Sequence, residues 1–122
     1  MYLIGPVNFT DEVLQADQPF LLLCMPCDDD FPGQRKLMED ASKHYGQQLK
    51  TGMLTEEFTE SFKKKFDIHG TPTFLIFWSG NEANRMLGLA DFRTLESFIR
   101  ETIQQTVTTA PNGNTSGYRQ EA

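Results

Sequence analysis

The chain has 122 residues and carries 11 Lys and Arg against 17 Asp and Glu, a formal net charge of −6 at pH 7. The length predicts one domain, and the acidic balance argues against nucleic acid as a partner, because proteins that bind phosphate backbones present a basic surface. There is no run of about 18 apolar residues and no basic segment leading into an apolar one at the start, so we expect a cytoplasmic protein without a membrane partner. Two cysteines are too few to staple a small secreted domain, so the fold must rest on an apolar core.

The first half of the chain alternates between strand and helix patterns. A continuous apolar run at 20–23 is typical of a strand that is covered on both faces, so we expect it at the centre of a sheet. Thr10 is expected to cap a short helix, and Gly46 stands where a helix C-terminus favours a positive φ. The expected elements are a strand at 2–4, a short helix at 11–16, a strand at 20–23 and a helix at 33–45.

The second half predicts a helical crossover followed by a hairpin. Phe58, Phe62 and Phe66 recur every fourth residue and form the apolar stripe of a helix, and Asp91 is expected to cap the closing helix. Strands are expected at 50–54, at 73–77 and around 85–89, with a turn at 79–81 between the last two. The order β-α-β-α-β-α-β-β-α predicts an α/β fold with a mixed central sheet and helices on both sides, a three-layer α/β/α sandwich.

Composition changes near residue 105. From there onward Thr, Asn, Gly, Ser and Gln dominate, and such a segment cannot bury enough apolar surface to offset the entropy lost on ordering. We therefore expect residues 1–104 to form the folded domain and residues 105–122 to form a flexible polar tail.

Two motifs carry chemistry. Cys-Met-Pro-Cys at 24–27 directly follows the expected central strand, and Gly-Thr-Pro-Thr-Phe at 70–74 opens a later one. Together with the order of the expected elements, these motifs make the chain resemble thioredoxin over about residues 9–103. The resemblance implies a thioredoxin-like fold in which Pro72 is cis and lies beside the redox site. It also implies that Thr71 presents backbone groups to an extended peptide, which could pair with them by strand addition.

The first functional hypothesis is a thiol–disulfide oxidoreductase that acts on disulfides in other proteins. In it Cys24 is the nucleophile and Cys27 resolves the mixed disulfide, while Met25, Pro26, Thr71 and Pro72 contact the substrate. No dissociable cofactor is required, and a disulfide reductase would be needed for turnover. Two thiolates and His69 would supply three metal ligands without an evident fourth, so we predict no metal. We expect a monomer.

Several positions depart from the family that the chain resembles. Counting forward from Phe9, the family's two cysteines fall on Asp29 and Pro32, and counting back from Tyr45 they fall on Asp28 and Phe31. Its buried acid becomes Leu23, and the lysine partner of that acid becomes Met53. Carboxylates at 28–30 would also raise the pKa of a neighbouring thiol.

These departures keep a second hypothesis open, a redox-inactive binding or assembly module. In it the groove beside Pro72 holds an extended segment, and the carboxylates at 28–30 select its charge. A disulfide between Cys24 and Cys27 requires the chain to turn, because an extended strand would hold their Cα atoms ~10 Å apart. Pro26 is compatible with a strand that ends at Cys24, and the sequence leaves the choice open.

Overall fold

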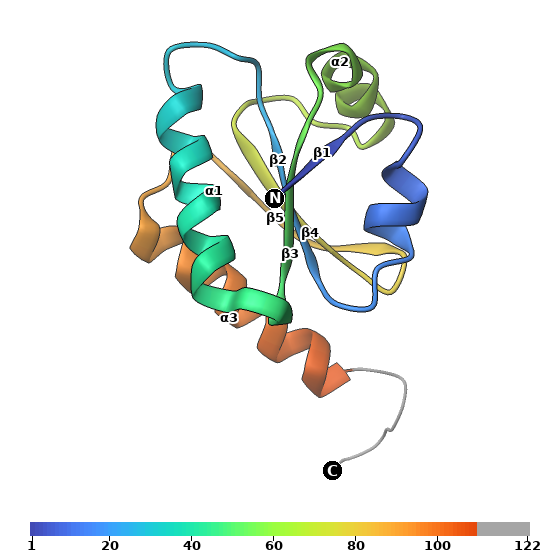
Figure 1. Cartoon of the computed structure of the whole chain (residues 1–122), viewed down its shortest axis with the longest axis vertical. Helices are drawn as coiled ribbons and strands as arrows, with labels where there is room; N and C mark the ends of the chain where they lie inside the picture. Colours follow the sequence, from blue (N-terminus) through green and yellow to red (C-terminus); the bar gives the residue numbers. More distant parts are fainter. Residues whose placement is uncertain (110–122) are drawn as a thin grey trace.

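A mixed sheet of five strands runs through the centre of the computed structural model, which describes residues 1–109 (Figure 1). The strands in spatial order are β1 (Tyr2–Ile4), β3 (Lys50–Leu54), β2 (Phe20–Cys24), β4 (Thr73–Trp78) and β5 (Asn81–Leu87). β1 and β2 both run parallel to β3, whereas β4 is antiparallel to β2 and β5 is antiparallel to β4. The predicted α/β fold with a mixed sheet is confirmed.

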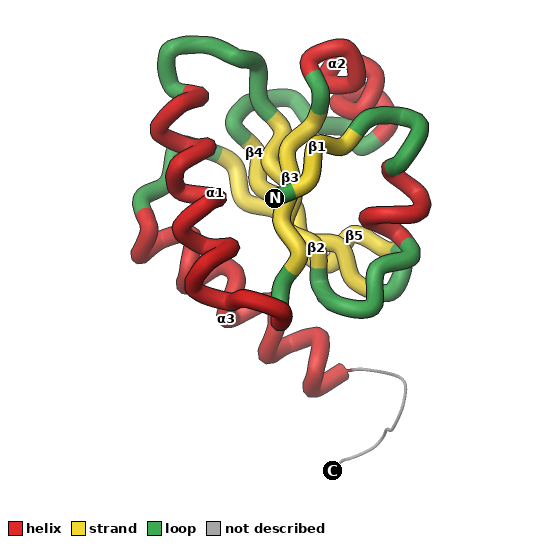
Figure 2. The backbone as a smooth tube through the Cα atoms, viewed as in Figure 1, coloured by secondary structure: helices red, strands yellow, loops and turns green. Residues whose placement is uncertain are grey.

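Helices cover both faces of the sheet (Figure 2). α1 (Phe31–Tyr45) and α3 (Phe92–Thr109) lie on one face, where they enclose a core with Leu21, Leu23 and Met25. α2 (Glu56–Lys65) and the short helix η1 (Thr10–Leu14) cover the other face. A further short helix, η2 (Gly46–Gln48), leads from α1 into β3. The three-layer arrangement is the one that the alternating sequence pattern predicts.

The central strand is buried along its whole length. All five residues of β2 are buried, because the strand has neighbours at both edges and helices over both faces. Successive side chains point to opposite faces, so Leu23 packs under α1 and α3 while Cys24 packs under α2. Because of this alternation, the side chains of Cys24 and Met25 lie on opposite faces of the sheet, Cys24 beneath α2 and Met25 beneath α1 and α3.

Phenylalanines fill the core beneath α2. Phe9 lies between 5.7 and 6.1 Å, ring centre to ring centre, from Phe58, Phe62, Phe66 and Phe77. All four contacts are edge-to-face, the arrangement that aromatic quadrupoles favour. The stripe that predicted α2 from the sequence is therefore its buried face.

The helix ends agree with the sequence in two cases and differ in one. Gly46 follows α1 with φ 56°, and the Asp91 carboxylate accepts a hydrogen bond of 2.8 Å from the Thr94 amide at the start of α3. The expected capping role of Thr10 is wrong, because the backbone is already helical at Phe9 and η1 begins at Thr10 itself.

The closing helix continues past the expected boundary at residue 104. α3 reaches Thr109, and Ile103 still packs against the core beneath α1. The Thr106 hydroxyl donates to the Ile103 carbonyl at 2.8 Å, which ties a polar side chain back to the helix. The rest of the expected tail, residues 110–122, lies outside the described residues. Within residues 1–109 no helix combines the length and the apolar character needed to cross a bilayer.

Candidate functional site

The first cysteine of the motif is at the end of the central strand. Cys24 is the last residue of β2, it is 0% exposed, and its register partner in β4 is Thr73. Its side chain belongs to the apolar core beneath α2. Burial raises the pKa of the Cys24 thiol to about 11, and the positive charge of Lys63 opposes this increase only in part.

The second cysteine lies in the loop that follows. Pro26 and Cys27 are exposed and lie outside helix and strand, and α1 begins four residues after Cys27, at Phe31. Both cysteines are free thiols in the structure. Neither of them lies in the first turn of α1, which begins at Phe31.

The solvent accessibility of the two thiols is the reverse of what their predicted roles require. The sequence hypothesis made Cys24 the attacking thiol, yet its side chain is buried in the core, whereas Cys27 is exposed to solvent. The physical reason is the extent of β2. The strand carries Cys24 into register with β4 and ends there, so that only the residues after Met25 leave the protein interior.

Three exposed carboxylates separate Cys27 from α1. The Asp28 side chain accepts a hydrogen bond of 3.0 Å from the Asp30 amide, and the Phe31 amide donates to the Asp28 carbonyl at 3.1 Å. These contacts turn the chain into the first turn of α1, where Pro32 lies. The acidic run is therefore both a local turn and a solvated negative surface next to Cys27.

The proline segment enters the sheet beside the end of β2. The Thr71–Pro72 peptide bond is cis, and β4 begins with the next residue, Thr73. Pro72 is buried, and its carbonyl accepts a hydrogen bond of 2.9 Å from the Gly88 amide. Since Thr73 is the register partner of Cys24, the fold brings the two sequence motifs together at one end of the sheet.

Apolar residues occupy the positions where the resemblance places a buried acid and its lysine. Leu23 is 1% exposed and Met53 is its register partner in β3. No group at this pair can accept or release a proton. This pair therefore cannot assist proton transfer to or from a thiol at the end of β2.

His69 does not join the cysteines in a ligand cluster. Its side chain is 84% exposed, and its Nε2 atom lies 2.8 Å from the Asp67 carboxylate. Within residues 1–109 no three His, Cys, Asp or Glu side chains converge in a way that could hold a metal ion.

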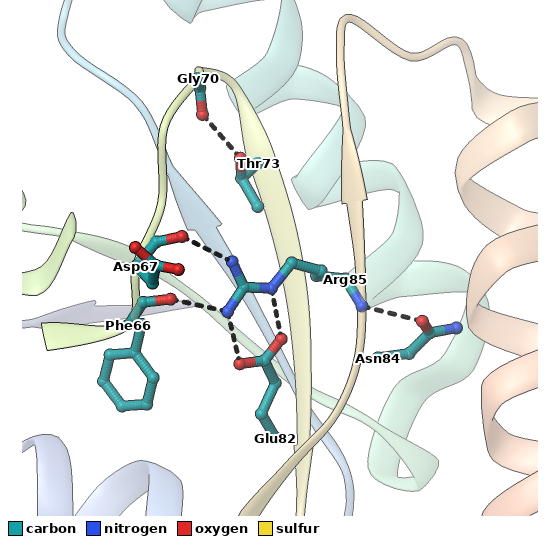
Figure 3. Close-up of polar contacts among 7 residues, drawn as sticks. All are labelled: Phe66, Asp67, Gly70, Thr73, Glu82, Asn84 and Arg85. Carbon is teal, nitrogen blue, oxygen red and sulfur yellow. Dashed lines mark hydrogen bonds and ion pairs between the residues drawn. The ribbon is translucent and has the colours of Figure 1, made fainter. Parts of the chain in front are cut away.

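Arg85 holds the segment that leads to Pro72, a role that the sequence did not reveal (Figure 3). Its guanidinium group pairs with both carboxylate oxygens of Glu82, at 2.5 and 2.8 Å. It also donates to the carbonyls of Phe66 and Asp67, at 2.7 and 3.3 Å, where α2 has just ended. These carbonyls belong to the C-cap residue of α2 and to the residue after it, so Arg85 ties β5 to the segment that leads from α2 to Pro72.

A shallow pocket of about 390 Å³ lies next to this contact. It is formed by residues of the segment before β4 and of strand β5, namely Asp67, Ile68, His69, Gly70, Thr73, Arg85 and Leu87. Leu87 and Leu89 are respectively 66% and 59% exposed, which leaves apolar surface beside the proline segment. The sequence placed Arg85 at the start of an expected strand around 85–89, which does not indicate the atoms that its side chain contacts.

A second unpredicted contact fixes the loop between β5 and α3. The Gln34 side-chain amide donates to the Ala90 carbonyl and accepts from the Ala90 amide, both at 3.1 Å. Gln34 is 8% exposed and lies in the first turn of α1, so it connects the loop after the cysteines to the loop after β5. No local pattern in the sequence pairs residues 56 positions apart.

The sheet order and the two helical layers together give the domain a thioredoxin-like fold (Figure 1). No protein-family model matches the sequence.

Curated proteins with similar sequences include two thioredoxins and a protein disulfide-isomerase. Protein disulfide-isomerase 5-1 of Arabidopsis thaliana is 25% identical over 105 residues, which cover 84% of this chain and 72% of that protein. The thioredoxin of Pseudomonas aeruginosa is 26% identical over 105 residues, covering 82% of this chain and 94% of that protein. Thioredoxin C-2 of Corynebacterium nephridii is 28% identical over 101 residues, which cover 79% of this chain and 90% of that protein. The chain therefore resembles thioredoxin-like proteins in sequence at modest identity, in agreement with its fold.

Proposed function

We propose that this protein is a thiol–disulfide oxidoreductase that acts on disulfides or dithiols in other proteins. The observation that carries the proposal is the meeting of the two motifs. Cys24 is the last residue of the central strand, and its register partner Thr73 directly follows the Thr71–Pro72 bond. Cys27 lies in the exposed loop after the strand. The names of the related proteins, two thioredoxins and a protein disulfide-isomerase, support the same chemistry.

The reaction needs no bound cofactor. One thiolate attacks a sulfur of the substrate disulfide, the second substrate sulfur leaves as thiolate, and the remaining protein thiolate then displaces the bound substrate sulfur. The substrate gains two electrons and the protein becomes a disulfide. A dithiol reductant, supplied by a partner reductase, returns it to the reduced form.

Substrate contact is proposed at the surface beside Pro72. Thr71 lies just outside β4, so its backbone can pair with an extended peptide by strand addition. Pro26 is exposed next to Cys27 and open to a substrate, whereas Met25 is 5% exposed and packs in the core with α1 and α3. A monomeric state, a cytoplasmic location and the lack of nucleic-acid binding remain predictions.

Titration in defined dithiol redox buffers tests the proposal. Thiols are trapped with a mass-tagging reagent at each potential, and the states of Cys24 and Cys27 are determined by mass spectrometry. We expect one two-electron transition with a bridge between the two cysteines inside a single chain. Thiols that stay reduced at every potential, or that link only different chains, would contradict it.

A second candidate is a redox-inactive binding module that uses the same surface. It is favoured by the burial of Cys24, and by the apolar Leu23–Met53 pair where the resemblance places proton-handling groups. Replacing both cysteines by Ser distinguishes the two, with Thr71→Pro as the matched perturbation of the surface. A binding module keeps its partners in the double cysteine variant and loses them in Thr71→Pro, which removes a backbone donor. An oxidoreductase loses its exchange activity in the double variant.

A further inference from the structure

The two thiols differ in what can reach them. Cys24 is 0% exposed and packs in the same apolar core as Phe58 and Ile68, whereas Cys27 is exposed. Exchange requires the attacking sulfur to approach one sulfur of the substrate disulfide directly, so access controls the rate together with the thiolate fraction. A disulfide carried by a folded protein cannot enter the core beneath α2.

We propose that Cys27 is the attacking thiol and Cys24 the resolving thiol, the opposite of the order that the motif suggests. This inference rests on the proposed oxidoreductase function. It follows from the position of β2, which ends at Cys24 and leaves Cys27 as the only cysteine on the surface within the described residues.

The exchange balances in this order. The Cys27 thiolate attacks one sulfur of the substrate disulfide, a Cys27–substrate bond forms, and the other substrate sulfur leaves as thiolate and takes a proton from solvent. Cys24 then loses its proton and attacks the Cys27 sulfur. The Cys24–Cys27 bond forms, the substrate sulfur leaves as a second thiolate, and two electrons have passed from the protein to the substrate.

A buried thiol is suited to the second step. It does not have to meet the substrate, only the sulfur three positions along its own chain. Residues 25–30 belong to no helix or strand, and the chain bends at Cys27 and Asp28, so this loop can fold back toward the end of β2. The Cys24 side chain points toward α2, so the strand end must open before the bridge closes.

The same arrangement makes the second step slow. The strand end opens only part of the time, and burial holds the pKa of the Cys24 thiol at about 11, so little thiolate forms near neutral pH. A mixed disulfide on Cys27 should therefore persist and be resolved faster as the pH rises toward 11.

Single-cysteine variants and an uncharged aromatic disulfide, dithiodipyridine, test the order. Each transfer releases one coloured thiopyridone, and mass spectrometry identifies the modified cysteine. Cys24→Ala keeps only Cys27, Cys27→Ala keeps only Cys24, and circular dichroism with thermal unfolding confirms that each variant is folded. The same reaction in concentrated urea measures each thiol without the fold.

We expect Cys24→Ala to release one equivalent rapidly and to keep a stable mixed disulfide. Cys27→Ala should react at least ~100-fold more slowly in native buffer, and the two rates should become similar in urea, because burial is the source of the difference. The unmodified protein should release a first equivalent rapidly and a second slowly, as the intramolecular bridge forms.

Two results would overturn the inference, and they have different meanings. If Cys27→Ala reacts as fast as Cys24→Ala in native buffer while the unmodified protein still forms the bridge, the assigned order fails and the oxidoreductase function stands. If the unmodified protein never releases a second equivalent and never forms the bridge, the oxidoreductase function fails, and the assigned order fails with it.

Discussion

Replacing Gln34 by Leu should loosen the loop between β5 and α3. Leu has nearly the volume of Gln, so the change removes the two hydrogen bonds to Ala90 without leaving a large cavity. Each of these neutral bonds contributes ~1 kcal/mol net. Ala90 is half-buried, so its amide and carbonyl regain water when the partner is removed, and the expected loss is about 2 kcal/mol in the free energy of unfolding.

Chemical denaturation followed by circular dichroism measures this loss, and for a domain of this size it corresponds to a melting temperature about 10 °C lower. Hydrogen exchange gives a local measurement, because the Ala90 amide should lose its protection while amides in β2 keep theirs. Gln48→Leu is the matched control, since it makes the same chemical change at an exposed position. The reasoning fails if Gln34→Leu unfolds within 0.5 kcal/mol of the unmodified protein, or if the Ala90 amide stays protected.

Three further predictions concern packing, pH and charge. Gly52→Ala should lower stability by about 1–3 kcal/mol in urea denaturation, because its Cβ would lie 2.8 Å from the Tyr2 carbonyl oxygen, and an unchanged midpoint would contradict this. The pKa of a thiol is ~8.5 in an unfolded chain, and burial raises it to about 11 at Cys24. The protonated Cys24 thiol should therefore contribute about 3 kcal/mol to the free energy of unfolding, fully present below pH ~8.5 and lost as the pH rises through 11. Melting curves of Cys24→Ala should lack that part of the alkaline decline, and parallel curves would refute it. Cys27 should react faster with a cationic disulfide than with an anionic one of equal reactivity, because carboxylates follow it at 28–30. The ratio of the two rates should decrease in 0.5 M salt. A ratio that does not change with salt would exclude this electrostatic cause.

Local patterns were sufficient to predict most elements of the fold. Phe58 and Phe62 indicated α2 because an apolar stripe every fourth residue suits one buried helix face, and the run ending in Leu23 indicated a strand that is covered on both sides. Gly46 was predicted correctly at a positive φ, because a single residue without Cβ determines that turn. The capping role of Thr10 was predicted wrongly, because the conformation of the preceding residue, Phe9, decides where that helix begins.

The site depended more on tertiary structure. The sequence by itself determined which chemistry is present, two thiols in a Cys-Met-Pro-Cys motif and a Thr-Pro pair, because residue identity carries that information. Only the folded chain decided which thiol meets solvent, since the register of β2 against β4 buries Cys24 and ends the strand before Cys27. The contacts of Gln34 with Ala90 and of Arg85 with Phe66 likewise join segments that are distant in sequence. Packing creates such proximity, and no local spacing encodes it.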